Sequence, residues 1–167
     1  MNWDAVGAIA QIVGVIVVVV TVMYLAVQTR QNTRAVQASV RQGMLAEDCE
    51  LLFKQMDFPF THITLIGRRE LSEDELVQLT TWIMVLMRTR ENYWLQYRSG
   101  NIDEATWQTY QKPLEGLLLM DIGRTIWGHF SAIGLFNASF VKGMDQHMAG
   151  VAPRGEPLTV RELVGLD

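Results

Sequence analysis

The stretch that decides the fold is AVGAIAQIVGVIVVVVTVMYLAVQT, residues 5–29, which holds no Asp, Glu, Lys or Arg. As an α-helix it would extend roughly 37 Å, enough to cross a hydrocarbon core of about 30 Å. A lone segment inside lipid must pair its backbone groups within itself, so it is expected to be helical despite its many valines. The alternatives are a buried core helix and a cleaved signal peptide, but the start MNWD lacks the basic residues of a signal. We therefore predict one transmembrane helix.

The charges beside this segment predict its orientation. Arg30, Arg34 and Arg41 follow it, whereas only Asp4 and the α-amino group precede it. Because basic flanks stay on the cytoplasmic side, the N-terminus is expected outside and the rest of the chain in the cytoplasm. The lone Cys49 agrees with a reducing compartment, since a single cysteine supports no internal disulfide framework.

Size, charge and residue types limit the classes of function. The chain has 167 residues, the size of one modest domain, and a net charge of −4. It has no basic excess to pair with a polyphosphate, so no nucleic-acid partner is expected. One Cys and three His in scattered positions do not give the spacing of a zinc site, and no phosphate-binding glycine loop or nucleophile elbow occurs. We therefore expect no enzyme activity, catalytic residue, cofactor or metal.

Small residues recur on one face of the predicted span. Gly7 and Gly14 are one heptad apart, Ala10 stands four residues before Gly14, and Gln11 and Thr21 add polar side chains. A face of small residues lets two membrane helices approach closely, so these five residues are candidates for packing between copies of the span. The alternative is that small residues are simply common in membrane helices.

The helix is expected to continue past the membrane to Asp57, because only Gly43 weakens it and Pro59 then ends it. Its apolar seam consists of four residues at spacings of four, three and four: Leu45, Cys49, Leu52 and Met56. This seam needs a partner, which is either the rest of the chain or another copy of it. Three acids fall on other faces and are expected in solvent: Glu47, Asp48 and Glu50.

A second helix is predicted over residues 73–98. Ser72 and Glu75 form a capping box before it, and Gly100 follows it. Its middle, WIMVLM at residues 82–87, is apolar on every side, which indicates a helix buried on every side. The candidate residues for a bundle or oligomer interface are therefore Leu45, Cys49, Leu52, Trp82 and Leu86.

The chain beyond Gly100 also reads as helical. Asp103 is expected to cap a third helix that Pro113 kinks or divides. Residues 121–123 are expected to interrupt the helical structure, and a further helix is predicted over 124–148. Residues 125–141 carry no charge but are marginal in length for a second span, so a core helix or a membrane-surface contact is expected there.

The predicted fold class is all-α. An N-terminal transmembrane helix continues into a long cytoplasmic helix, and a bundle of three or four further helices follows. The expected divisions are an anchor over 1–30, a neck and first bundle helix over 31–57, a helical cytoplasmic domain over 58–149, and a linker with a short C-terminal helix over 150–167.

One polar cluster stands out on the helix over 73–98. It consists of Arg88, Arg90, Glu91, Asn92, Trp94 and Tyr97. Buried arginine and glutamate usually form internal ion pairs, and arginine also stacks on aromatic rings. The alternative is a pocket that holds a small anionic ligand between Arg90 and an aromatic wall.

Two stretches resemble a known family. The opening NWDAVGAIAQIVGVIVVVVTVMYLAVQTRQNTRAVQAS, and the later RTRENYWLQYRSGNIDEATW with GRTIW, are similar to a widespread, uncharacterised family of bacterial membrane proteins with a GAI-x-x-IVG...YLA-x-Q-x-RQNT segment. The resemblance covers most of the chain to about Phe140. It implies a single-pass, helical protein of the bacterial inner membrane and supplies no catalytic residue. Many members have Glu where this chain has Gln11, so a membrane carboxylate does not carry over.

Three functions are compatible with these features. The favoured one is a non-enzymatic, membrane-anchored assembly or adaptor protein, which associates with itself or with another membrane protein complex. The second is an oligomeric pore, although Val15 to Val20 would form a hydrophobic constriction. The third is a sensor of a small anionic ligand that uses Arg90, Glu91 and Asn92. The expected partners are the lipid bilayer and either further copies or a membrane complex.

Overall fold

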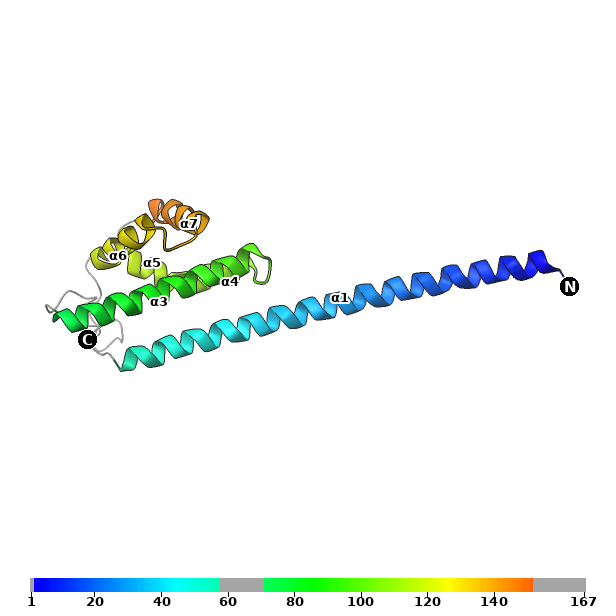
Figure 1. Cartoon of the computed structure of the whole chain (residues 1–167), viewed down its shortest axis with the longest axis horizontal. Coiled ribbons are helices and arrows are strands. Elements are labelled where there is room, and N and C mark those ends of the chain that lie inside the picture. The colour runs from blue at the N-terminus through cyan, green and yellow to red at the C-terminus, as the bar shows by residue number, and fades with distance from the viewer. Residues whose placement is uncertain (1, 58–70, 152–167) are drawn as a thin grey trace, which may run out of the picture. The chain divides into compact units, whose positions relative to one another are not determined.

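The computed structural model describes residues 2–57 and 71–151, and this part of the chain is all-α, as predicted (Figure 1). Its helices are α1 (Trp3–Met56), α3 (Glu73–Arg98), α4 (Glu104–Tyr110), α5 (Lys112–Leu118), α6 (Asp121–Ala132) and α7 (Ala138–Ala149). The chain divides into an N-terminal unit, Met1–Gln42, and a C-terminal unit, Gly43–Asp167. Two parts of the predicted divisions lie outside the described residues: 58–70, the start of the helical domain, and 152–167, which includes the short C-terminal helix.

The N-terminal unit consists of the first part of α1. Its large apolar side chains, from Ile12 to Val27, are exposed, and no residue of its most apolar window is buried. Among the described residues, α1 is the one helix long and apolar enough to cross a membrane. The hydroxyls of Thr21 and Thr29 donate to the carbonyls of Val17 and Leu25, at 2.8 Å each, so these polar groups are paired within the helix.

The C-terminal unit is organised around α3. The capping box is confirmed: the Ser72 hydroxyl accepts from the Glu75 amide, and the Glu75 carboxylate accepts from the Ser72 amide at 3.0 Å. The helix ends before Gly100, whose φ of 73° suits a residue without a side chain. Its buried side chains include Leu79, Ile83, Leu86 and Met87.

The described residues of one chain do not bury α3 on every side, and its burial in an oligomer interface stays a prediction. Val77 and Val85 are exposed, and Trp82 and Met84 are only half-buried. Within residues 2–57 and 71–151, neighbouring elements therefore cover one side of α3 and leave Val77 and Val85 exposed.

Helices α4 to α7 follow the predictions in part. The Asp103 carboxylate accepts from the Thr106 amide at 2.8 Å and caps α4, and Pro113 stands in the first turn of α5, after the break between α4 and α5. The predicted break at 121–123 is wrong, because α6 begins at Asp121. Gly123 instead packs against the backbone of Leu117, a contact that leaves no room for a side chain.

The predicted helix over 124–148 is divided in two. Helix α6 ends at Ala132, Gly134 has a φ of 72°, and the Asn137 side chain accepts from the Ser139 amide at 3.0 Å to cap α7. Residues 125–141 are therefore not one helix. Their aromatic residues form the core here, where Trp127 lies 5.3 Å from Phe136 and 5.6 Å from Phe140 between ring centroids.

Candidate functional site

The last turns of α1, residues 43–56, have an inner face that packs within the C-terminal unit. This inner face consists of Met44, Asp48, Leu51 and Gln55, at spacings of four, three and four. Met44 is 3% exposed and Gln55 is 7% exposed. The seam predicted from the sequence has the same spacing and lies one position further along, so the face that packs within the chain is the more polar neighbour of the predicted seam.

The predicted seam is instead an exposed surface, which we call the outer stripe: Leu45, Cys49, Leu52, Phe53 and Met56. Leu45 is 57% exposed, Leu52 is 61% exposed and Met56 is 76% exposed, while Cys49 is half-buried. The sequence left two partners open for this seam, and the described residues of the same chain leave Leu45 and Leu52 exposed. Their role in an interface with another chain stays a prediction.

An ion pair joins the inner face to α3. Arg90 Nη1 lies 2.5 Å from Asp48 Oδ1, and the Arg90 side chain is 4% exposed. The Arg90 guanidinium also lies 5.1 Å from the centroid of the Tyr93 ring. Asp48 is therefore not the solvated acid that the sequence suggested, because it neutralises a buried cation.

Tyr93 completes this contact. Its hydroxyl donates to the Met44 carbonyl at 2.7 Å and lies 3.2 Å from Asp48 Oδ1. Burial, followed by the negative charges of Asp48 and Glu47, raises the pKa of Tyr93 above its usual range, so the phenol keeps its proton. A neutral phenol can serve as a donor to α1 at every physiological pH.

Glu91 contacts a different part of the chain from Arg90. Its Oε2 accepts from Arg88 Nη1 at 2.6 Å, and its Oε1 accepts from the Asn137 amide at 2.5 Å. Arg88 Nη1 also donates to the Leu135 carbonyl at 2.9 Å. Glu91 and Arg88 therefore fix the turn between α6 and α7 against α3.

The predicted polar cluster is thus not one pocket. Asn92 is exposed, the Trp94 ring lies 5.8 Å from Phe140, and the Tyr97 ring lies 6.4 Å from Trp107. Arg90 and Glu91 form separate contacts with two different parts of the chain. These contacts support the interpretation that the cluster fixes the positions of neighbouring helices.

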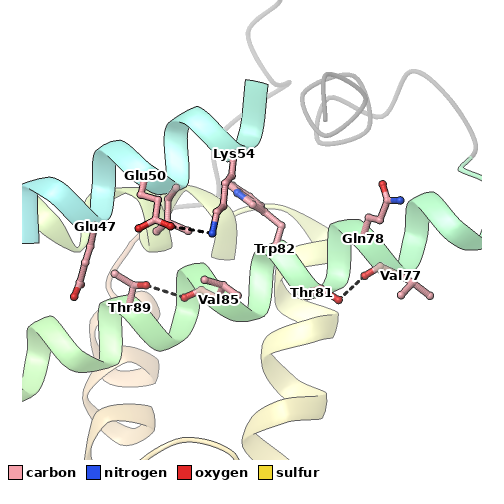
Figure 2. A pocket seen from close by; sticks show the side chains of 10 residues that line it. Glu47, Glu50, Lys54, Val77, Gln78, Thr81, Trp82, Val85 and Thr89 are labelled. Atoms are coloured by element: carbon pink, nitrogen blue, oxygen red, sulfur yellow. Dashed lines mark hydrogen bonds and ion pairs between the residues drawn. The ribbon is translucent and has the colours of Figure 1, made fainter. Parts of the chain in front are cut away.

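Two hollows flank the contact between the last turns of α1 and α3. The first is a groove of about 400 Å³, in which Trp82 and Val85 of α3 face Glu50 and Lys54 of α1 (Figure 2). Lys54 and Glu50 form an exposed ion pair at 2.9 Å across its rim. The second is a cavity of about 310 Å³ between α1, α3 and the segment that begins with α5. Trp82 and Leu51 line both hollows.

The candidate packing residues of the span lie in the N-terminal unit. Gly7, Gln11 and Gly14 are exposed, and a Cβ at either glycine would meet nothing within 4 Å. The side chain of Ala10 lies outside the described residues, and the Thr21 hydroxyl is bonded to its own helix. Their role between helices stays a prediction.

Other chemistry is limited in the described ranges. Residues 2–57 and 71–151 contain no group of three or more His, Cys, Asp or Glu side chains that could hold a metal ion. Glu115 and His147 form a pair, with His147 Nε2 3.1 Å from Glu115 Oε2. No protein-family model, curated protein or solved structure matches the chain.

Proposed function

We propose that the chain is a membrane-anchored assembly protein whose copies associate in parallel along α1. In this proposal α1 crosses the bacterial inner membrane with its N-terminus outside, because Arg30, Arg34 and Arg41 follow the apolar segment. The exposed apolar side chains of the N-terminal unit support the anchor, since only lipid or another apolar helix can cover them. The C-terminal unit is then cytoplasmic.

The outer stripe is the observation that carries the proposal. Its large apolar side chains follow one another on a single helix face, and the described part of the C-terminal unit leaves them exposed. A contiguous apolar patch on a folded unit marks a surface that binds another molecule. The inner face lies one position away on the same helix and already packs against its own chain, where Asp48 pairs with Arg90 of α3.

The heptad register of α1 supports a second copy of the chain as the partner. If Gly7 is placed at position a, then Gly14, Thr21, Cys49 and Met56 also fall at a. The d positions then include Ala10, Leu45 and Leu52. None of the charged residues of α1 falls at a or d. A strict seven-residue repeat keeps two helices in contact over many turns when they supercoil with a left hand.

A second copy of the chain fits both ends of this register. Every copy enters the membrane in the same orientation, so equivalent residues stand at the same depth and the helices are parallel. An in-register pair then sets small residues against small residues in lipid, and Leu45 and Leu52 against their equivalents beyond it. Confinement to one membrane also raises the effective concentration of the copies for each other.

Disulfide cross-linking of the full-length protein in its native membrane tests the proposal. Cys49 is the only cysteine, so oxidation of the natural chain reports directly on position a. In a Cys49→Ser background, Leu45→Cys and Leu52→Cys move the thiol to d positions, and Glu47→Cys moves it to the outward f position. Disulfides need Cβ atoms within about 4.5 Å, so we expect dimers from positions 45, 49 and 52 and few from position 47.

Two results would contradict the proposal. Equal cross-linking from position 47 would show random collision, and the absence of dimers from all positions would show that the outer stripe does not meet itself. A mixed disulfide with a different membrane protein at fixed ratio would instead identify an accessory subunit.

A further inference from the structure

We propose that a pocket lined by α3, α4 and α7 binds the primary ammonium group of a small amine or a lipid headgroup. The pocket has a volume of about 190 Å³ and lies within the C-terminal unit. A cavity of about 150 Å³ is enough to hold benzene, so this volume suits a headgroup or a short amine. The inference does not depend on self-association, because the described lining residues include none from α1.

A buried amide without a partner carries the proposal. Gln111 is 5% exposed and lines the pocket. Its backbone N–H donates to the Trp107 carbonyl at 2.9 Å, but its side-chain amide forms no hydrogen bond with a described residue. Buried polar groups in folded proteins are nearly always bonded, so this amide points to a ligand or a water molecule in the pocket.

The Gln111 amide is accessible from the pocket. In the described part of the chain, the polar side-chain atoms that are both fully enclosed and without a partner are Nε1 of Trp82, Nε of Arg90 and Oγ of Ser131. The amide of Gln111 is not among them, so it keeps accessible surface on the pocket that it lines.

The charges of the lining favour a cation. Glu104 is the acid among the described lining residues, which include no Lys or Arg. Its Oε1 accepts from Gln108 Nε2 at 3.2 Å, and a carboxylate has further lone pairs with which to accept from a ligand. His147 also lines the pocket, but its Nε2 lies 3.1 Å from Glu115 Oε2 and therefore already has a partner. An anionic ligand would meet Glu104 without a lysine or arginine to balance it.

Aromatic rings supply the second attraction for a cation. Trp94, Tyr97 and Trp107 line the pocket, and the last two rings lie 6.4 Å apart between centroids with their planes within 11° of each other. Arg98 already lies over the Trp94 ring at 5.5 Å, so Tyr97 and Trp107 are the rings left for a ligand. A cation within about 6 Å of such a ring is attracted by its negative face.

The hydrogen-bonding groups favour a primary ammonium over a quaternary one. The Gln111 carbonyl oxygen and the Glu104 carboxylate are acceptors, and a primary ammonium brings three N–H donors to them. A quaternary ammonium would interact with the rings and leave both acceptors without a donor.

The n-butylammonium ion is a suitable soluble probe. We expect saturable magnetisation transfer from the full-length protein to this ion in nanodiscs of phosphatidylglycerol, with empty nanodiscs as the reference. Two competitors separate charge from N–H donation: 1-butanol, which is neutral, should bind at least about tenfold more weakly, and tetramethylammonium about three- to tenfold more weakly.

Nanodiscs that contain phosphatidylethanolamine distinguish the two sources of the ammonium group. A raised apparent Kd for n-butylammonium in these nanodiscs would identify the lipid headgroup as the occupant. An unchanged Kd would identify a soluble amine. Both results are consistent with an ammonium site.

Two polar variants test the acceptors. Gln111→Met keeps an unbranched side chain and removes an amide without a partner, so it should fold and lose about three- to tenfold in affinity. Glu104→Gln removes the charge from an exposed residue and should lose about tenfold. Glu73→Gln is its matched control, because Glu73 is an exposed acid in the first turn of α3 and does not line the pocket.

A glycine variant tests the pocket itself. Gly143→Leu should abolish saturable transfer, because Gly143 lines the pocket and a Cβ there makes only an ordinary contact at 3.9 Å. Gly128→Leu is the matched control: a Cβ at Gly128 meets nothing within 4 Å, and binding should persist. Circular dichroism shows whether each variant is folded.

Three outcomes would overturn the inference. Transfer that does not saturate would show that only water occupies the pocket. Equal binding of 1-butanol would show that charge has no part in recognition. An unchanged affinity in folded Gln111→Met and Glu104→Gln variants, or an equal loss in Glu73→Gln, would place the binding outside this pocket.

Discussion

The two units of the chain are both helical, but for different physical reasons. In the N-terminal unit the apolar side chains face outward and none of the apolar window is buried, so the surroundings must supply the apolar contact. In the C-terminal unit Leu79, Ile83, Met87 and Phe140 are fully enclosed by the chain itself. Helix α1 takes part in both, which means that one helix is expected to meet lipid, its own bundle and another copy along its length.

This contrast predicts that each unit can be disrupted without the other. Buried pairs and close packing should decide the stability of the C-terminal unit, whereas hydropathy alone should decide whether the N-terminal unit anchors. The outer stripe belongs to the C-terminal unit by position and resembles the N-terminal unit by its exposure.

The largest effect is expected from Asp48→Ala. This change leaves the Arg90 guanidinium buried without its carboxylate, which should lower the free energy of unfolding by about 3 kcal/mol. Denaturant unfolding of the full-length protein in detergent, followed by tryptophan fluorescence, measures it. Membrane fractionation should show that anchoring is unchanged.

The double variant Asp48→Leu with Arg90→Met is the control for this prediction. It removes both charges together, so it should lose clearly less stability than Asp48→Ala. If both variants were equally unstable, packing volume rather than the ion pair would hold the inner face to α3.

The second-largest effect is expected from Val18→Arg, which changes the N-terminal unit and leaves the C-terminal unit unaltered. A charge at the centre of the span should make membrane insertion less favourable by about 2.5–3.5 kcal/mol. Val36→Arg is the matched control, since Val36 is also exposed but stands beyond the apolar segment, and its insertion should be unchanged. A glycosylation-based insertion assay measures both, and an equal loss in Val36→Arg would move the predicted membrane boundary.

Two glycines of α6, Gly123 and Gly128, test how closely the C-terminal unit is packed. A Cβ at Gly123 would overlap the Leu117 carbonyl oxygen and lie 2.9 Å from Leu117 Cγ, so Gly123→Ala should destabilise the unit by about 1–3 kcal/mol. Gly128→Ala meets nothing within 4 Å and should stabilise the helix by up to about 1 kcal/mol. Thermal unfolding measures both. Opposite signs are expected, and a stable Gly123→Ala variant would argue against the close contact of α5 with α6.

Much of the fold follows from local sequence signals. The helix caps at Ser72 and Asp103 and the separation of α4 and α5 near Pro113 are predictable because a few neighbouring residues determine them. The division between α6 and α7 carries comparable signals, Gly134 and Asn137, but the apolar residues between them concealed it. Polar caps therefore predicted the helix starts at Ser72 and Asp103, but not the one at Asn137, which lies within an apolar stretch.

The site follows less well, because it depends on contacts between distant residues. Hydrophobic periodicity ranks helix faces by apolar content, so it selected the outer stripe over an inner face that carries Asp48 and Gln55. That polar face is buried because Asp48 meets Arg90, 42 residues further along the chain. Nor does any pattern within one segment indicate a hollow that residues of three segments line.

The smallest effect concerns a surface pair of the C-terminal unit and depends on pH. Burial raises the pKa of Glu115, but hydrogen bonds from Lys112 and His147, together with their charges, outweigh it and lower the pKa below its ordinary value of 4.5. A lowered pKa in the folded state gives stability that is present above the unfolded value and lost as the pH falls through the folded value.

Glu115→Gln removes this titration and should reduce stability by less than about 1 kcal/mol at neutral pH, since Lys112 is exposed. Urea unfolding of both proteins between pH 7 and 3 should show a difference that is steady above about pH 5 and shrinks below it. A difference that grew toward acid pH would mean that burial, rather than the two cations, controls this carboxylate. The contact of α5 with α7 at Glu115 would then be a strained one, and the C-terminal unit would depend still more on its apolar core.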